Sequence, residues 1–143
     1  MGGDLSSAPK ATAPSFLIRA IKDPDGANLE RIQLIKGWLD ESGLQHEKIY
    51  DIALSEGAGH ASTVDVEKAS YNNRIGVPEF ALVWKDPDFN PDEVAFYYLR
   101  VLEIPTPHWT AYDAKYFDTA PVYERGPMVT QERAYTSPIW YTP

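Results

Sequence analysis

The chain is patterned as short runs in which apolar and polar residues alternate, and turn-forming residues separate the runs. Residues 16–22 form the first run, and the Pro and Gly within residues 23–26 predict a tight turn after it. Residues 29–40 and 46–54 alternate in the same way around a loop that contains Gly43, which predicts a β-hairpin. The first third of the chain is therefore predicted to be built of strands.

The pattern continues toward the carboxy terminus. Residues 78–84 and 94–104 are predicted strands, and the second carries bulky side chains on both faces, as is typical of a central strand. Residues 63–73 are predicted to form a short strand because Val64 and Val66 alternate with polar neighbours. Residues 130–140 close the chain as a last strand, which Pro138 restricts to an edge or a bulge.

A long stretch without strand periodicity lies between the last two predicted strands. Residues 105–129 contain four prolines and are predicted to be irregular, with one helical turn around residues 112–117. Irregular segments of this length inside a small domain are usually functional or lie against another body.

These elements predict an all-β fold, a single antiparallel β-sandwich of the immunoglobulin-like kind with a long irregular Pro-rich loop. The sandwich domain is expected to comprise residues 15–143. Residues 1–14, which are rich in Gly, Ser, Ala and Pro, are expected to be a linker or a tail.

Charge and composition exclude several partners. The 13 Lys and Arg residues against 21 Asp and Glu residues leave a net charge of −8, which argues against binding to a nucleic acid backbone. No apolar run approaches the roughly 20 residues that span a membrane, so no membrane partner is expected.

The chain has no cysteine, which excludes thiolate metal sites and cysteine nucleophiles. The amino terminus has no apolar segment typical of a signal peptide, and export of a longer parent to the periplasm or the medium stays open.

An acidic loop offers the nearest approach to a metal motif. Asp or Asn stands at every second position from Asp86 to Asp92, as in the first half of a calcium-binding loop. The sixth position, which needs Gly, is Pro91, and the twelfth, which needs Glu, is Tyr97. This departure favours an acidic surface turn, and an irregular calcium site is the alternative.

The remaining candidates for chemistry are weaker. His46, His60 and His108 have no spacing typical of metal ligands. Residues 53–57 resemble a nucleophile elbow only in part, and no helical pattern follows them. We therefore expect no catalytic residue, no metal site and no cofactor in this chain.

Aromatic residues suggest a binding function as an alternative. The chain has four Trp and nine Tyr residues, and Trp109, within the Pro-rich stretch, is expected at the surface. Exposed aromatic rings are suited to stacking on sugars. A carbohydrate- or ligand-binding β-sandwich module is thus the second hypothesis.

Several phrases of the sequence together resemble a known family. They are Lys22–Leu29, Ile32–Trp38, His46–Asp51, Trp84–Phe89, Phe96–Pro107, Trp109–Asp113 and Gln131–Tyr141. In this order and with these gaps, they are similar to the carboxy-terminal part of the bacterial domain of unknown function 3604 family. The resemblance covers nearly the whole chain.

That resemblance implies a role within a longer protein. Members of the family are several times longer than this chain, and their amino-terminal part is similar to the PHP (polymerase and histidinol phosphatase) metal-dependent phosphoesterases. The His-x-His motif of those enzymes is not present here. The resemblance therefore implies a non-catalytic carboxy-terminal module, with a divalent metal expected in the catalytic domain of the parent and none in this chain.

The catalytic domain of the parent is then the expected partner. We hypothesise that five residues near the Pro-rich stretch and the last strand face it, as a docking surface or as the rim of its cleft. They are Glu103, His108, Trp109, Glu132 and Arg133. The alternative is that these are ordinary residues of a loop and an edge strand.

Overall fold

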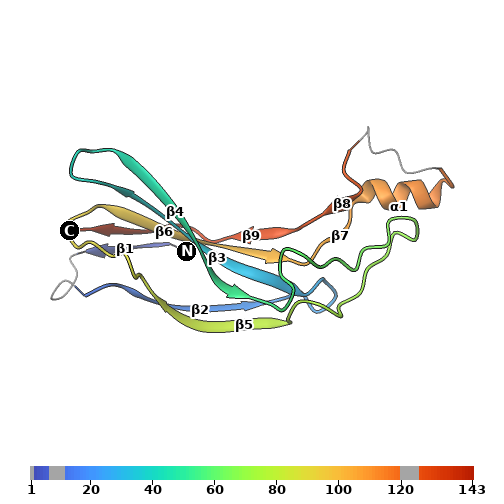
Figure 1. The fold of residues 1–143 in the computed structure, drawn as a ribbon, viewed down its shortest axis with the longest axis horizontal. Helices are drawn as coiled ribbons and strands as arrows, with labels where there is room; N and C mark the ends of the chain where they lie inside the picture. Colours follow the sequence, from blue (N-terminus) through green and yellow to red (C-terminus); the bar gives the residue numbers. More distant parts are fainter. Residues whose placement is uncertain (1, 7–11, 120–125) are drawn as a thin grey trace.

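The fold was analysed in a computed structural model that describes residues 2–6, 12–119 and 126–143. It is an all-β sandwich, as predicted (Figure 1). The elements are β1 (Gly3–Ser6), β2 (Ser15–Ile21), β3 (Leu29–Leu39), β4 (Gln45–Leu54), β5 (Glu79–Lys85), β6 (Ala95–Glu103), β7 (Thr106–Pro107), α1 (Trp109–Tyr116), β8 (Val129–Thr130), β9 (Arg133–Tyr135) and β10 (Ile139–Thr142).

Two sheets form the sandwich. The larger sheet has six strands in the order β1-β10-β6-β3-β4, and β9 pairs with β6 beyond the end of β10. The smaller sheet is the antiparallel pair β2 and β5, which runs below the larger sheet in Figure 1. Strand β6 lies between β3 and β10, which confirms the prediction of a central strand.

The predicted hairpin is present as β3 and β4. Their antiparallel register pairs Leu34 with Tyr50 and is interrupted by an irregularity between Ile32 and Gln33. The alternation along β3 directs Leu34 into the sandwich, where it forms a core cluster with Tyr97 and Tyr141. Phe16 of the smaller sheet packs on this cluster, so the core lies between the two sheets.

The first residues contribute to the larger sheet. Within the segment expected to be a linker or a tail, β1 pairs with β10, and the pairing is parallel, in contrast to the antiparallel arrangement predicted throughout. Strand β10 would otherwise present unpaired N–H and C=O groups along this side, and β1 provides partners for them.

The prediction of a strand over residues 63–73 is wrong. The segment has only an isolated bridge between Asp65 and Ser70, within a series of turns. Side chains take the place of ladder partners: the Thr63 hydroxyl donates to the Asn72 carbonyl, and Asp65 accepts from the Lys68 amide. Such local hydrogen bonds of Thr, Asn and Asp compete with strand pairing.

The single last strand predicted over residues 130–140 is also wrong, because the segment is divided into the end of β8, β9 and the start of β10. Pro138 lacks an amide hydrogen, and the Thr136 hydroxyl accepts the hydrogen bond of the Leu99 amide where a ladder partner would stand.

The Pro-rich stretch holds more regular structure than predicted. It contains β7, α1 and the start of β8, and the helix begins earlier than the single turn predicted over residues 112–117. Residues 120–125 of the stretch lie outside the described residues. No helix within the described ranges is long and apolar enough to cross a membrane.

Candidate functional site

Three of the five predicted docking residues lie together. Glu103 ends β6, while Glu132 and Arg133 lie beside it because β9 pairs with the end of β6. The Glu103 amide donates to the Glu132 carbonyl at 3.0 Å. All three residues line a groove of about 420 Å³, which also contacts the end of β2.

The groove carries charges of both signs, with Asp23, Glu103 and Glu132 set against Arg19, Lys22 and Arg133. Burial, with the nearby carboxylates of Glu132 and Asp23, raises the pKa of Glu103 above its ordinary value. The adjacent Lys22 ammonium is held by three carbonyl oxygens of the turn after β2, at 2.7 to 2.9 Å. Within the described ranges, no group of three or more His, Asp or Glu side chains is arranged to hold a metal ion. The groove is therefore suited to a polar partner surface that presents both donors and acceptors of hydrogen bonds.

His108 and Trp109 lie apart from this groove, where β7 meets α1. His108 immediately precedes the helix, its amide donates to the Met128 carbonyl, and its Nδ1 lies 3.1 Å from the Thr110 hydroxyl. These contacts give His108 a structural role in the turn. Trp109 is 62% exposed, in agreement with the prediction that it lies at the surface.

Helix α1 presents an aromatic surface to solvent. Besides Trp109, the exposed rings are Tyr112 (48%), Tyr116 (83%) and, directly after the helix, Phe117 (67%). The buried residues of α1 are the small Thr110 and Ala111. In Figure 1 the helix stands at the end of the molecule farthest from the carboxy terminus. We refer to Trp109, Tyr112, Tyr116 and Phe117 as the α1 aromatic surface.

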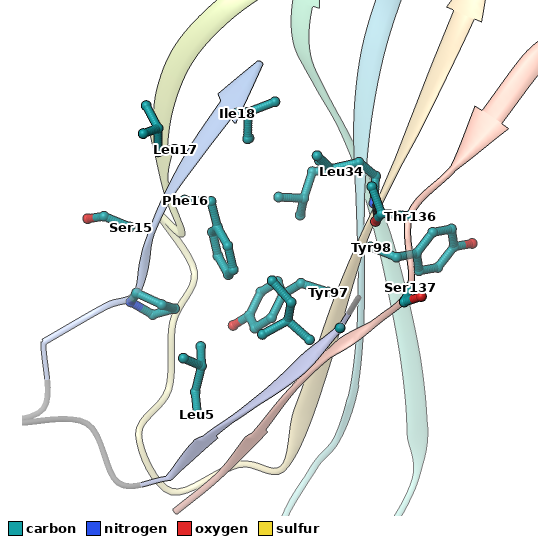
Figure 2. Close-up of a pocket in the computed structure, with 14 residues that line it drawn as sticks. Leu5, Ser15, Phe16, Leu17, Ile18, Leu34, Tyr97, Tyr98, Thr136 and Ser137 are labelled. Atoms are coloured by element: carbon teal, nitrogen blue, oxygen red, sulfur yellow. Dashed lines mark hydrogen bonds between the residues drawn. The ribbon is translucent and has the colours of Figure 1, made fainter. Parts of the chain in front are cut away.

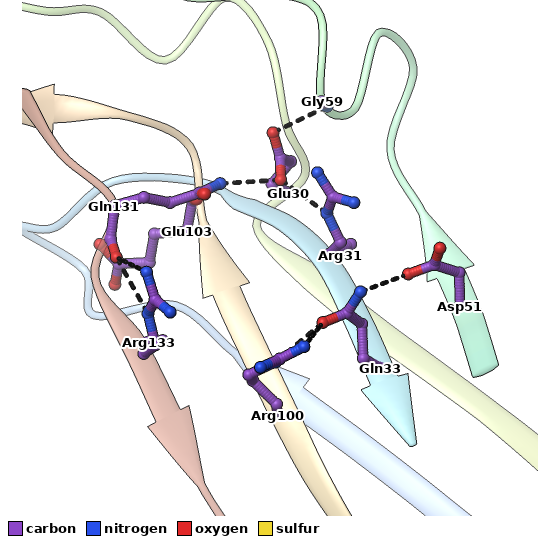
Figure 3. A network of polar contacts seen from close by, with 9 residues as sticks. All are labelled: Glu30, Arg31, Gln33, Asp51, Gly59, Arg100, Glu103, Gln131 and Arg133. Carbon is purple, nitrogen blue, oxygen red and sulfur yellow. Dashed lines mark hydrogen bonds and ion pairs between the residues drawn. The ribbon is translucent and has the colours of Figure 1, made fainter. Parts of the chain in front are cut away.

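A polar network that the sequence analysis missed lies beside the first groove (Figure 3). At its centre is Glu30, which is 3% exposed and accepts hydrogen bonds from the Gly59 amide, Arg31 Nε and Gln131 Nε2 at 2.7 to 2.9 Å. Gln131 also donates to the Glu103 carbonyl, so the network joins β3 to the segment before β9. The sequence did contain one signal for this network: Glu30 is a charged residue directly after Leu29 in the predicted hairpin strand, where apolar residues dominate.

A second row of polar contacts crosses the outer face of the larger sheet beside this network. Arg100 donates to the Gln33 side chain, and Gln33 donates in turn to Asp51 at 2.8 Å. Figure 3 shows this row spanning three neighbouring strands. Because these side chains bond to one another across three strands, the row is a structural brace.

An apolar cleft opens between the two sheets near the amino terminus (Figure 2). It encloses about 570 Å³, and Phe16, Ile18 and Leu34 are among its walls, with Tyr97 at one side. The Tyr97 hydroxyl is already bonded to Asp86 at 2.8 Å. Among the described residues, the polar members of its lining are Ser15, Thr136, Ser137 and the two tyrosines, Tyr97 and Tyr98, and no His, Lys, Asp or Glu is among them.

The acidic loop after β5 is organised by the protein's own cations. Asp86 Oδ2 accepts from Lys36 and Tyr97, and Asp88 Oδ2 accepts from Lys48 and Tyr50. These ammonium and hydroxyl groups occupy carboxylate oxygens that a calcium ion would need. The arrangement supports the acidic turn over the calcium site.

Comparison with known protein families gave a match over the whole chain. The family described as "Protein of unknown function (DUF3604)" matches residues 1–143. Searches of curated proteins and of solved structures found no match.

Proposed function

Since the chain belongs to the DUF3604 family of proteins of unknown function, over residues 1–143, we propose that it is a non-catalytic β-sandwich module that packs on a catalytic domain. The catalytic domain is a PHP-like, metal-dependent hydrolase of the same protein. The module fixes the position of that domain and shapes the rim of its cleft.

The α1 aromatic surface carries this proposal. Its four rings are between 48% and 83% exposed, which is unusual for large aromatic side chains gathered on one short helix. Complete burial of one large apolar side chain contributes about 1.5–3 kcal/mol, and rings that are already partly buried contribute less, before the costs of association. A contiguous aromatic patch of this kind marks an interaction site.

The groove at the end of β6 and β9 adds polar contacts to the same role. Glu103, Glu132 and Arg133 provide carboxylates and a guanidinium at its surface, where they can orient a partner without performing bond cleavage. His108 supports the helix that bears Trp109. The five residues predicted to dock thus divide between two separate places, the charged groove and the helix end at which His108 supports Trp109.

Hydrogen–deuterium exchange on the full-length protein tests the proposal. Amides of residues 109–117 should exchange more slowly in the full-length protein than in this chain alone, because the partner domain covers α1. The double variant Trp109→Ala, Tyr116→Ala should remove that protection, whereas Trp140→Ala, at the other end of the molecule, should not. Equal exchange of residues 109–117 in the two proteins would overturn the proposal.

A second experiment tests the absence of catalysis in the module itself. Phosphoesterase assays of this chain with added Mg²⁺, Mn²⁺ or Zn²⁺ should show no turnover. Activity that persists through stringent purification and disappears in His108→Ala would contradict a non-catalytic role.

A further inference from the structure

The outer face of the larger sheet carries a hollow at the end away from α1. The hollow encloses about 450 Å³, within the size range of small-ligand sites. It lies where β3 leads into the hairpin turn, at the end of the molecule opposite the α1 aromatic surface (Figure 1). It is therefore separate from the proposed docking surface.

One row of residues crosses the sheet through the hollow. Glu47 of β4 pairs with Gly37 of β3, Gly37 pairs with Phe96 of β6, and Phe96 pairs with Trp140 of β10. Residues paired in this way share a face of the sheet. Leu34, Lys36 and other residues of the opposite parity point into the sandwich, so this row faces outward.

Gly37 makes room for an aromatic ring. A Cβ atom at this position would lie 2.4 Å from Phe96 Cζ, so the Phe96 ring extends over the backbone of β3. The Trp140 ring adjoins it with a centroid distance of 5.2 Å, and the Tyr98 ring lies nearly parallel to it at 6.3 Å. Trp140 is 47% exposed. Phe96 and Trp140 thus form an aromatic side of the hollow, and the Tyr98 ring continues this strip beyond it.

Polar side chains stand on the other side. Glu47 and Gln45 line the hollow from β4 and are exposed. Neither side chain has a hydrogen bond or ion pair with any other part of the chain that the structure describes. A carboxylate and an amide are thus available to a ligand on the β4 side of the hollow, and the exposed Trp140 ring stands on its β10 side.

From this juxtaposition, we infer that the hollow binds a neutral pyranose glycan. The C–H face of a sugar ring is apolar and packs on the electron-rich face of an aromatic ring, here that of Trp140. Its hydroxyl groups require hydrogen-bond partners, which Glu47 and Gln45 supply, and a hydroxyl bound to a carboxylate makes a strong hydrogen bond. The Glu47 carboxylate and the net charge of −8 disfavour sulfated or uronic glycans.

Affinity electrophoresis tests the inference directly. Native gels would contain xylan, hydroxyethyl cellulose, mixed-linkage β-glucan or galactomannan as neutral probes, with alginate as the anionic control. We expect at least one neutral polysaccharide to retard the chain and alginate to leave its mobility unchanged. Trp140→Ala should weaken retardation about tenfold or more, as expected on loss of a central aromatic contact, and Glu47→Ala should weaken it severalfold.

Matched variants separate this site from other exposed aromatic residues. Trp109→Ala should bind as the unmodified chain does, because α1 is at the opposite end, and Trp140→Phe should retain most binding because it keeps a ring. Thermal unfolding of each variant would verify folding. The inference is overturned when no neutral polysaccharide retards the chain, or when Trp109→Ala abolishes retardation and a folded Trp140→Ala retains it.

Discussion

Lys36 Nζ lies 2.7 Å from Asp86 Oδ2 in the interior of the sandwich, where the two side chains are 2% and 0% exposed. Lys36 also donates to the Asp88 carbonyl, and Asp86 accepts from the Tyr97 hydroxyl. This ion pair ties β3 to the loop after β5, so it links the two sheets of the sandwich.

The first prediction concerns this buried pair. Lys36→Met should lower the free energy of unfolding by about 3–5 kcal/mol, because it leaves the Asp86 carboxylate buried without its cation. The double variant Lys36→Met, Asp86→Leu should recover a large part of that loss, since no charge then remains buried. Urea unfolding measures both. A double variant that is less stable than either single variant would contradict this account.

Local patterns predicted the strands well and their side-chain partners poorly. The hairpin and β6 could be predicted because alternation and turn residues act over a few neighbouring positions. Lys36 and Asp86 are 50 residues apart, and Glu30 and Gln131 are 101 apart. No local pattern encodes such pairs, which arise only when the sheets pack.

Among the candidate docking residues, too, a local pattern could predict the position of some and not the spatial neighbours of others. Trp109 could be predicted at the surface from its place in a Pro-rich stretch. That Glu103 lies beside Glu132 depends on β9 returning along β6, which a sequence pattern does not specify. The row from Glu47 to Trp140 was missed for the same reason, because four strands have to be placed in register to form it.

The second prediction compares two glycines with similar backbones. Gly76 has φ +74°, and a Cβ there would lie 2.7 Å from Asn28 Cβ and 2.8 Å from Ile104 Cγ2. Gly76→Ala should therefore cost about 2–5 kcal/mol, from left-handed strain together with overpacking. Gly43 has φ +79° and open space around the added atom, so Gly43→Ala should cost only about 1 kcal/mol. Equal losses in urea unfolding would show that packing at Gly76 is unimportant.

The third prediction is a pH dependence centred on Glu30. Burial raises the pKa of Glu30, but hydrogen bonds from Gly59, Arg31 and Gln131 outweigh it and hold the pKa below the ordinary value of 4.5. The unfolded state then binds the proton more tightly, so this stabilisation is present above pH 4.5 and is lost as pH falls through the folded pKa. Glu30→Gln should lower stability by about 1–3 kcal/mol at pH 7.

The difference between Glu30→Gln and the unmodified chain should narrow progressively below pH 4.5. Glu56→Gln is a suitable control because Glu56 is exposed in the adjoining loop, and it should change stability little at any pH. If Glu30→Gln loses as much stability at pH 3 as at pH 7, the charge of Glu30 is not the cause of the loss.

The fourth prediction has the opposite sign and concerns Glu103. Burial, Glu132 and Asp23 raise the pKa of Glu103, so its folded state binds the proton more tightly than the unfolded state does. The stabilisation that this raised pKa implies is fully present below pH 4.5, the ordinary pKa of Glu, and is lost as pH rises through the folded pKa.

The variant Glu103→Gln keeps the shape of the side chain without its charge. At pH 7 it should be more stable than the unmodified chain, by no more than about 1 kcal/mol because the groove is open to solvent. This advantage should vanish well below pH 4.5. Thermal unfolding across this pH range measures it, and a Glu103→Gln variant that is destabilised at pH 7 would show that the carboxylate makes a favourable contact in the free chain.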